Sequence, residues 1–291
     1  MRLSQSTIPF PVGPNPRKEQ VADWAELVAL DTQGAFKRGD MKSALSREDI
    51  SNADTLDELA WGELVTRSRV CGSVWPFRLE DAVLTPRTPR GISRRFYRFL
   101  AMLGLGEGVT ADDRRLFEEA FAELMAAMTG APGIRVGHPP TADQATSFAD
   151  RFKGFLDGAG SSNEERGKDL LPTDNDLGLD AAATTTLFAD DRGGATLHYW
   201  AQCSTGYNWE EKLSDLDFEV WRPHFAWSVL PVKLMATPLV LTMPEPKWHR
   251  VVRKGGVVID RPRLLQLSRQ KPLGNETLKT MSRRCRENLT L

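Results

Sequence analysis

Apolar residues recur every three or four positions in several segments of this chain, which is the spacing of one face of an α-helix. The segments with this spacing are residues 19–31, 46–70, 93–104, 110–128, 141–157 and 209–220. Residues 1–18 are rich in proline and polar residues and predict an extended arm. Two prolines interrupt residues 79–92, which predicts a loop. These patterns together predict a helical N-terminal subdomain over residues 19–105.

Short runs of apolar and β-branched residues predict strands in the rest of the chain. The runs are residues 134–137, 179–188, 195–203, 237–243 and 250–260. The sequence A-D-D-R-G-G separates the second run from the third and is typical of a hairpin turn. Gly255 and Gly256 interrupt the last run and predict a hairpin or a bulge. The mixture of helices and strands predicts an α/β fold, with residues 106–291 as a second domain.

Composition narrows the class of protein. The 291 residues are 41% hydrophobic and 26% charged, which is ordinary for a soluble globular protein. The net charge of -1 gives no global sign of nucleic-acid binding, so any such binding depends on local basic patches. Three distant cysteines, no apolar run long enough for a membrane span and no signal-peptide pattern predict a cytoplasmic protein without a membrane partner. The four histidines lack zinc-site spacing.

Polar residues at the ends of the two central strands are the candidates for chemistry. Asp180 precedes the first of these strands, and Gln202 and Ser204 share one side of the second because side chains alternate along a strand. Glu118 lies at the edge of the apolar stripe on the helix over residues 110–128. Oxygen ligands of this kind suit Mg²⁺, which can assist phosphodiester hydrolysis. The same parity places Cys203 on the core side, where a thiol is inert.

Each of these residue types is also common without any site, so spacing alone leaves a structural interpretation open. The tryptophans 200, 209, 221 and 227 have two interpretations as well, base stacking or core packing. The arginines near residues 94–98 and 283–286 are interpreted either as phosphate contacts or as a solvated face.

One motif adds a resemblance to a known family. The sequence D-L-G-L-D, a hairpin and then Q-C-S-T-G-Y-N-W-E-E-K-L resemble an uncharacterised group of bacterial proteins related to the PD-(D/E)XK nucleases. W-P-F at 75–77, L-F-E-E-A-F and V-V-I-D-R-P-R-L at 257–264 are similar to features of that group. The resemblance spans most of the chain after about residue 55. It is specific in the hairpin region and loose elsewhere.

The resemblance implies a restriction-endonuclease-like mixed sheet flanked by helices, in the order helix, strand, hairpin, helix, strand. It implies Mg²⁺- or Mn²⁺-dependent cleavage of nucleic acid, with DNA as the expected substrate, in bacterial defence against phage or foreign DNA. Asp180, Gln202 and Glu118 would then hold the metal, with Gln202 at the (D/E) position. Protein partners of a defence assembly and self-association are further expectations.

The chain departs from the superfamily pattern at Ser204, where a lysine is usual. Lys212 on the following helix is the expected substitute, because a lysine side chain is long and flexible. The residues expected to contact nucleic acid are Tyr207, Arg250, Arg253 and Lys254. The alternative is a catalytically degenerate nuclease fold that binds DNA or protein as a scaffold, and Ser204 favours it.

Overall fold

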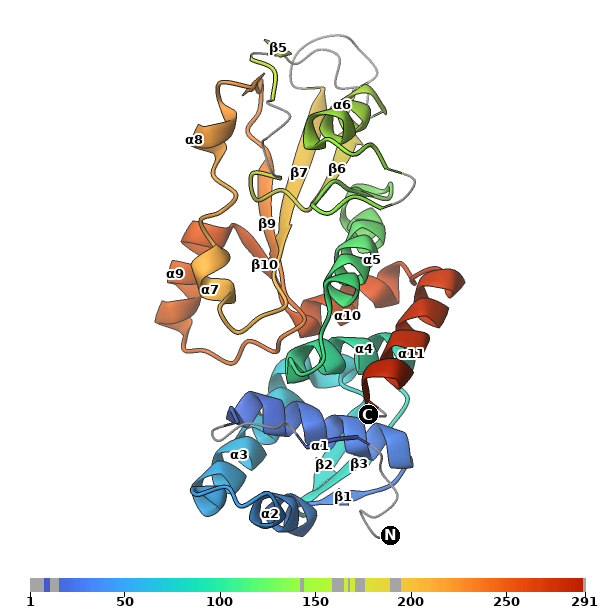
Figure 1. The fold of residues 1–291 in the computed structure, drawn as a ribbon, viewed down its shortest axis with the longest axis vertical. Coiled ribbons are helices and arrows are strands. Elements are labelled where there is room, and N and C mark those ends of the chain that lie inside the picture. The colour runs from blue at the N-terminus through green and yellow to red at the C-terminus, as the bar shows by residue number, and fades with distance from the viewer. Residues whose placement is uncertain are drawn as a thin grey trace. The chain divides into compact units, whose positions relative to one another are not determined.

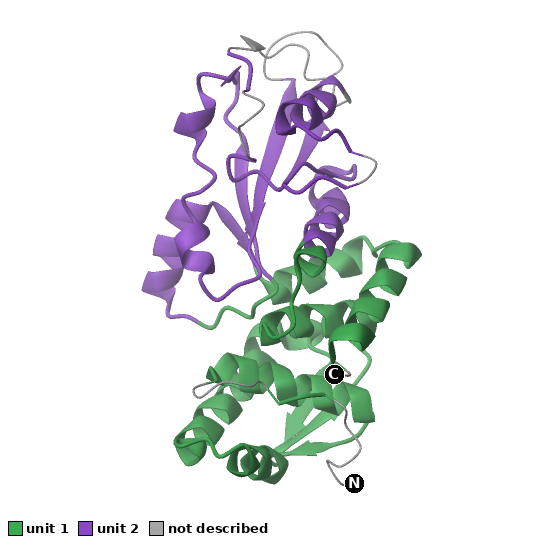
Figure 2. Cartoon of the chain, in the orientation of Figure 1, with its two compact units in different colours: residues 1–114, 238–242, 260–291 green, residues 115–237, 243–259 purple. Residues whose placement is uncertain are grey.

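The computed structural model describes residues 8–10, 16–141, 144–158, 165–166, 168–170, 176–188 and 195–289 (Figure 1). Its fold is mixed α/β, as expected. The chain divides into two compact units (Figure 2). Unit 1 comprises residues 1–114, 238–242 and 260–291, and unit 2 comprises residues 115–237 and 243–259. Within the described ranges, no helix is both long enough and apolar enough to cross a lipid bilayer.

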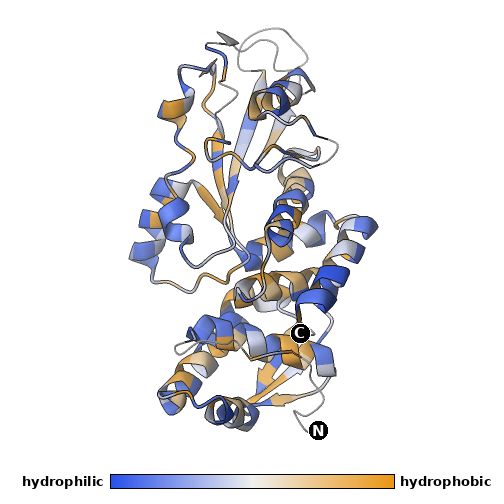
Figure 3. Ribbon diagram, in the orientation of Figure 1, coloured by the Kyte–Doolittle hydropathy of each residue, from blue (hydrophilic) through white to orange (hydrophobic). Residues whose placement is uncertain are grey.

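Unit 1 combines helices with one small antiparallel sheet of order β1-β3-β2. Its elements are α1 (Lys18–Thr32), β1 (Phe36–Lys37), α2 (Arg38–Arg47), α3 (Ala53–Cys71), a 3-10 turn (Gly72–Val74), β2 (Phe77–Glu80), β3 (Val83–Pro86), α4 (Arg94–Leu105), α10 (Arg261–Gln270) and α11 (Asn275–Leu289). Helix α4 is mostly hydrophobic and α11 mostly hydrophilic (Figure 3). Nine of the ten residues of α4 from Phe96 to Leu105 are buried, so this helix lies in the core of the unit.

A buried ion-pair network lies at the centre of unit 1. Arg67 Nη1 donates to Asp23 Oδ1 at 2.7 Å and to Glu26 Oε2 at 2.9 Å, and Arg261 Nη1 contacts the same two carboxylates. All four side chains are at most 1% exposed. The other contacts of the network are made by Glu63, Trp75, Tyr97 and the carbonyls of Glu19, Leu100 and Pro238. The network therefore fixes α10 to helices α1, α3 and α4.

The two units are not the consecutive stretches of the chain that the sequence had suggested. We expected a boundary near residue 105 with everything after it in one domain, but α10 and α11 belong to unit 1. Arg261 enters the buried network, and Arg284 Nε of α11 donates to Asp113 Oδ1 at 2.7 Å. Both contacts join positions far apart in the sequence, so local patterns cannot reveal them.

Unit 2 is built on a five-stranded mixed sheet of order β10-β9-β7-β6-β4. Its elements are α5 (Ala111–Thr129, of which 111–114 are assigned to unit 1), β4 (Ile134–Arg135), α6 (Phe148–Gly158), β5 (Glu165–Arg166), β6 (Ala181–Thr186), β7 (Thr196–Cys203), α7 (Trp209–Lys212), α8 (Phe218–Trp221), β8 (Phe225–Ala226), β9 (Val232–Ala236), α9 (Glu245–Gly255) and β10 (Val257–Ile259). Strands β6 and β7 are antiparallel, whereas β9 is parallel to both β7 and β10.

An aromatic cluster covers one face of this sheet. Phe152 of α6 packs edge-on against Trp200 of β7, with ring centroids 5.4 Å apart, and Trp200 also packs against Trp221 at 4.6 Å. Trp200 and Trp221 are fully buried, and Trp209 is 4% exposed. The described structure therefore supports core packing for these three tryptophans, whereas Trp227 is half-buried.

The helix expected over residues 110–128 has the predicted N-terminal cap. Thr110 N–H donates to Asp113 Oδ2 at 2.8 Å, and Asp113 N–H donates to Thr110 Oγ1 at 3.3 Å, which is a reciprocal capping box. The strand pair is confirmed as β6 and β7, although its expected turn at 189–194 lies outside the described residues.

Five local expectations were wrong. The expected loop at 79–92 overlaps the β2–β3 hairpin of residues 77–86, whose turn places Asp81 and Ala82 at positive φ. Residues 250–255 belong to helix α9 rather than to a strand, and Gly256 ends that helix at φ +74°. The expected helix over 209–220 divides into α7 and α8, and that over 46–70 begins only at Ala53. The candidate strand at 237–243 is not a strand; β9 ends at Ala236.

Candidate active site

Glu118 projects from α5 toward the edge of the sheet and meets a buried arginine there. Arg135 Nε of β4 donates to Glu118 Oε2 at 2.7 Å, and the two side chains are 3% and 13% exposed. Gln144 supports the arginine by accepting from Arg135 Nη1 at 3.3 Å and donating to its carbonyl at 2.7 Å. The acid expected on the core helix therefore lies in a polar site, but it is already paired with a cation.

Asp180 lies at an irregularity just before β6. Its N–H donates to the carbonyl of Ala201 at 2.9 Å, although Ala201 is also the register partner of Ala181. Asp180 Oδ2 accepts the N–H of Cys203 at 2.7 Å. The alternation of side chains is thus broken at Asp180, and strand parity does not determine which side it faces.

Asp180 and Glu118 converge on Gly137, in the segment after β4. A Cβ atom placed on Gly137 would lie 2.9 Å from Asp180 Oδ1 and 3.2 Å from Glu118 Oε2. The N–H groups of Val136 and Gly137 both donate to the Asp180 carbonyl, at 2.8 and 3.0 Å. A residue without a side chain at position 137 therefore lets two carboxylates approach the same point.

A third carboxylate, Asp176, belongs to the turn that leads into this site. Its Oδ1 accepts the N–H of Gly178 at 3.0 Å, and its Oδ2 accepts the N–H of His138 at 3.3 Å. Leu177 and Gly178 both have positive φ, 47° and 77°. The D-L-G-L-D motif is thus a tight turn that brings both of its aspartates to one place.

Replacing Gly178 by alanine is expected to destabilise unit 2. The left-handed backbone costs a residue with a Cβ about 1 kcal/mol, and this Cβ would also lie 2.5 Å from the backbone carbon of Asp215. Thermal unfolding followed by circular dichroism measures the loss. Gly154→Ala is the matched control, because a Cβ there meets no atom within 4 Å. Equal melting temperatures for the two variants would contradict the assigned turn.

The carboxylates at this site repel one another. Burial raises the pKa of Asp180 well above its usual range, and the nearby charges of Glu118 and Asp176 raise it further. Burial likewise raises the pKa of Glu118 to about 7, although Arg135 opposes the rise. Such an excess of buried negative charge is typical of functional sites that receive a cation or a proton.

Cys203 lies nearer to the acids than the strand parity suggested. Burial raises the pKa of its thiol, and the charges of Asp180 and Glu118 add to the increase. A thiol whose thiolate is disfavoured in this way is a poor nucleophile. The expected inertness of Cys203 is therefore supported by its surroundings, even though it is close to the site.

Gln202 is 5% exposed, and its Oε1 has no hydrogen-bond partner within the described part of the chain. A buried amide oxygen without a donor is costly, so this atom has capacity for a ligand. Among the described residues, Gln202 makes no hydrogen bond with Asp180 or Glu118. The structure brings Glu118 and Asp180 together. Gln202 lies on β7, next to Cys203, whose N–H donates to Asp180.

The cation expected from Lys212 is close to the site but engaged elsewhere. Lys212 Nζ pairs with Asp215 Oδ2 at 3.1 Å, and 49% of its side chain is exposed. Its hydrogen bond and ion pair with Asp215 raise the pKa of Lys212, and the charges of Asp176 and Asp180 contribute in the same direction. Ser204 is buried, and its backbone N–H donates to the carbonyl of Ala236. Its hydroxyl is uncharged and cannot replace the usual lysine.

The cations expected to contact nucleic acid lie on helix α9. Arg250 and Lys254 line a cleft of about 360 Å³ with Lys247, Glu210 and Leu213, and Lys247 pairs with Glu210. Arg253 is exposed but does not line this cleft, and Tyr207 is half-buried in the turn before α7. Lys247 was missed because no helix was predicted over residues 245–255, of which residues 250–255 were interpreted as part of a strand.

Arg135 and Asp176 are the other site residues that the sequence did not identify as functional. An arginine inside the short apolar run I-R-V-G was the available signal for Arg135, because a buried arginine needs a carboxylate partner. Asp176 was noted only as part of the motif. Across the ranges that the structure describes, no group of three or more His, Cys, Asp or Glu residues is arranged to hold a metal ion.

Comparison of the chain with models of protein families, with curated protein sequences and with solved structures finds no match. Any function must therefore be argued from the site itself.

Proposed function

We propose that unit 2 is a restriction-endonuclease-like nuclease domain that hydrolyses DNA phosphodiester bonds with the aid of Mg²⁺ or Mn²⁺. The observation that carries this proposal is the convergence of Asp180 and Glu118 on Gly137 at the start of β6. Both carboxylates are partly enclosed, and burial together with neighbouring carboxylates raises the pKa of each, although Arg135 opposes the rise at Glu118. A role in bacterial defence rests on the sequence resemblance alone.

The topology of unit 2 supports the same class. After α5 come β4, the antiparallel pair β6 and β7, the short helices α7 and α8, and then β9 parallel to β7. This is the order helix, strand, hairpin, helix, strand that the resemblance implies, with α6 and β5 inserted before the hairpin and β8 inserted before β9. The two acids lie at the start of the hairpin and on the helix before the sheet.

The donor atoms suit a hard cation. Mg²⁺ is commonly held by one or two carboxylates, keeps several waters and completes its shell with substrate phosphates. Asp180 and Glu118 would supply the carboxylates, and the unpartnered Oε1 of Gln202 an amide oxygen. When bound, the metal would polarise the phosphate and lower the pKa of a water. Arg135 fixes the position of Glu118 through its hydrogen bond. Lys212 adds a positive charge that interacts with Asp176 and Asp180.

The proposal is tested by incubating the purified chain with labelled duplex DNA, single-stranded DNA and RNA. We expect cleavage with Mg²⁺ or Mn²⁺ and none with EDTA, because the carboxylates need a divalent cation to bind a phosphate. Cleavage that persists in EDTA would contradict the metal-dependent mechanism. The absence of cleavage on every substrate with either metal would contradict the nuclease assignment.

A catalytically degenerate, nucleic-acid-binding scaffold is the second candidate. The specific observation that favours it is that Arg135 already neutralises Glu118 at 2.7 Å while Lys212 pairs with Asp215 at 3.1 Å. Intact DNA after incubation with both metals, together with measurable DNA binding, would identify the scaffold.

A further inference from the structure

Two basic segments that are far apart in the sequence meet in unit 1. Arg94, Arg95 and Arg98 occupy the first turns of α4, while Lys279, Arg283 and Arg286 follow one another at i, i+4 and i+7 on α11. These helices are in contact, and Asn288 Nδ2 of α11 lies 3.6 Å from Met102 Sδ of α4. The six cations line a surface that we call the α4–α11 groove.

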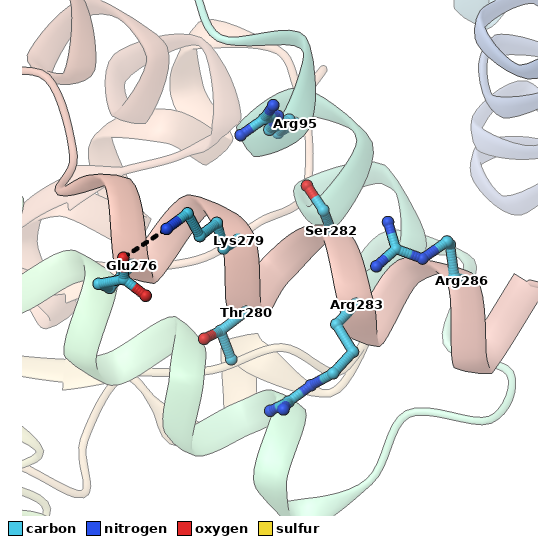
Figure 4. Close-up of a pocket in the computed structure, with 7 residues that line it drawn as sticks. All are labelled: Arg95, Glu276, Lys279, Thr280, Ser282, Arg283 and Arg286. Carbon is cyan, nitrogen blue, oxygen red and sulfur yellow. Dashed lines mark hydrogen bonds and ion pairs between the residues drawn. The ribbon is translucent and has the colours of Figure 1, made fainter.

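The groove consists of two adjoining clefts. One, of about 470 Å³, is lined by Arg95, Glu276, Lys279, Thr280, Ser282, Arg283 and Arg286 (Figure 4). The other, of about 240 Å³, is lined by Leu30, Gln33, Arg94, Arg95, Arg98, Ser282, Cys285 and Arg286. Because both clefts include Arg95, Ser282 and Arg286, they form one continuous basic surface.

Carboxylates neutralise only part of this charge. Lys279 pairs with Glu276 at 2.7 Å, Arg98 with Asp31 at 3.0 Å, and Arg283 with Glu287 at 3.8 Å. Arg95 is exposed and makes no ion pair with any residue that the structure describes. The Nε atoms of Arg94 and Arg98 are buried without a hydrogen-bond partner in the described part of the chain. Positive charge therefore remains in the groove, at Arg95 in particular, in a chain whose net charge is -1.

The spacing of the cations fits a polyanion with regular charges. Lys279 and Arg286 are seven residues apart, which is about 10.5 Å along a helix axis. Each strand of duplex DNA carries one phosphate per roughly 3.4 Å of its axis, so this span corresponds to about three phosphates. Arginine guanidinium groups bind phosphate oxygens in pairs. None of the exposed large hydrophobic residues within the described ranges lines the groove, which disfavours insertion into a lipid surface.

We propose that the α4–α11 groove binds the phosphodiester backbone of nucleic acid without reading its bases. This binding is independent of cleavage by unit 2 and holds for either candidate function.

Fluorescence anisotropy with a labelled duplex DNA in EDTA tests the groove, because cleavage is suppressed there. The variant is the double charge reversal Arg95→Glu/Arg283→Glu, in which both arginines are exposed. We expect affinity to fall at least about tenfold and the salt dependence to become shallower by about two counterions. The matched control is Arg47→Glu/Arg78→Glu, which makes the same charge change at exposed positions outside the groove. It should stay within about twofold of wild type, since only net charge has changed.

Three results would overturn the proposal. They are the absence of DNA binding by the wild-type chain, equal losses in the two double variants, and binding to phosphatidylserine vesicles in place of DNA. Unchanged melting temperatures in both variants would show that the comparison concerns binding rather than folding. This measurement is made in EDTA, whereas the cleavage test requires Mg²⁺ or Mn²⁺, so failure of the nuclease proposal and failure of the groove are separate outcomes.

Discussion

Replacing Asp180 by asparagine is expected to reduce metal-dependent cleavage by about a thousandfold. A bound metal supplies several kcal/mol of transition-state stabilisation, and each 1.36 kcal/mol corresponds to about a factor of ten in rate. Asparagine keeps the shape of the side chain, and its oxygen can still accept the Cys203 N–H that Asp180 Oδ2 accepts at 2.7 Å. Initial rates on one labelled duplex, with protein of matched concentration, measure the effect.

The same substitution should make the metal-free protein more stable at pH 8. Asp180 and Glu118 both have raised pKa values, and that of Glu118 is about 7. Carboxyl groups of this kind stabilise the fold while protonated, and stability is lost as pH rises from about 4, the unfolded pKa, through the folded pKa. Wild type in EDTA should therefore melt at a lower temperature at pH 8 than at pH 5, and Asp180→Asn should reduce that difference.

The control for both measurements is Asp54→Asn on α3. Asp54 is exposed and pairs with Lys42 at 2.9 Å, and surface pairs contribute little to stability. Its cleavage rate and melting temperature should match those of wild type. A wild-type cleavage rate for Asp180→Asn would remove Asp180 from the active site, and an identical pH dependence of melting would contradict its buried charge.

Replacing Arg261 by methionine is expected to lower the free energy of unfolding by about 3–5 kcal/mol, the usual result of removing one partner from a buried ion pair. The change leaves Asp23 and Glu26 with Arg67 as their only charged partner among the described side chains. It also removes the donors to the carbonyls of Pro238 and Leu100. Denaturant unfolding measures the loss, which corresponds to a melting temperature lower by roughly 10 °C.

Arg263→Met is the matched control, because Arg263 is exposed two positions further along α10. It should change the free energy of unfolding by less than about 1 kcal/mol. Adding Asp23→Asn to Arg261→Met should restore part of the lost stability by removing one of the carboxylates left with excess charge. A loss below about 1 kcal/mol for Arg261→Met alone would show that the network does not hold α10 in place.

Local patterns in the sequence predicted the elements whose stability is local. The capping box of Thr110 and Asp113 and the apolar stripe after it predicted α5, and short runs of apolar and β-branched residues predicted β6 and β7. Gly255 and Gly256 were misinterpreted because a glycine pair can end a helix as well as turn a hairpin. A Cβ on residue 256 would clash with the carbonyl oxygen of Lys233. Lys233 is 23 positions away in the sequence, so a short sequence segment does not reveal this contact.

The candidate site was predictable in its acids but not in its cations. Asp180 and Glu118 could be placed because one follows a turn motif and the other borders an apolar stripe. The pairing of Arg135 with Glu118 depends on how a two-residue strand packs beside a helix, which the sequence does not specify. Lys212 was chosen by its reach along the chain, whereas its contact with Asp215 depends on the break between α7 and α8.

The interleaving of the two units affects how the protein is made. Asp23 and Arg261 are 238 positions apart, so at 5–20 residues per second the ribosome delivers the second roughly 10–50 s after the first. During that interval Asp23, Glu26 and Arg67 lack the cation with which they are finally buried. We infer that the N-terminal helices remain hydrated or chaperone-bound on the ribosome, while residues 115–237 are already free to fold.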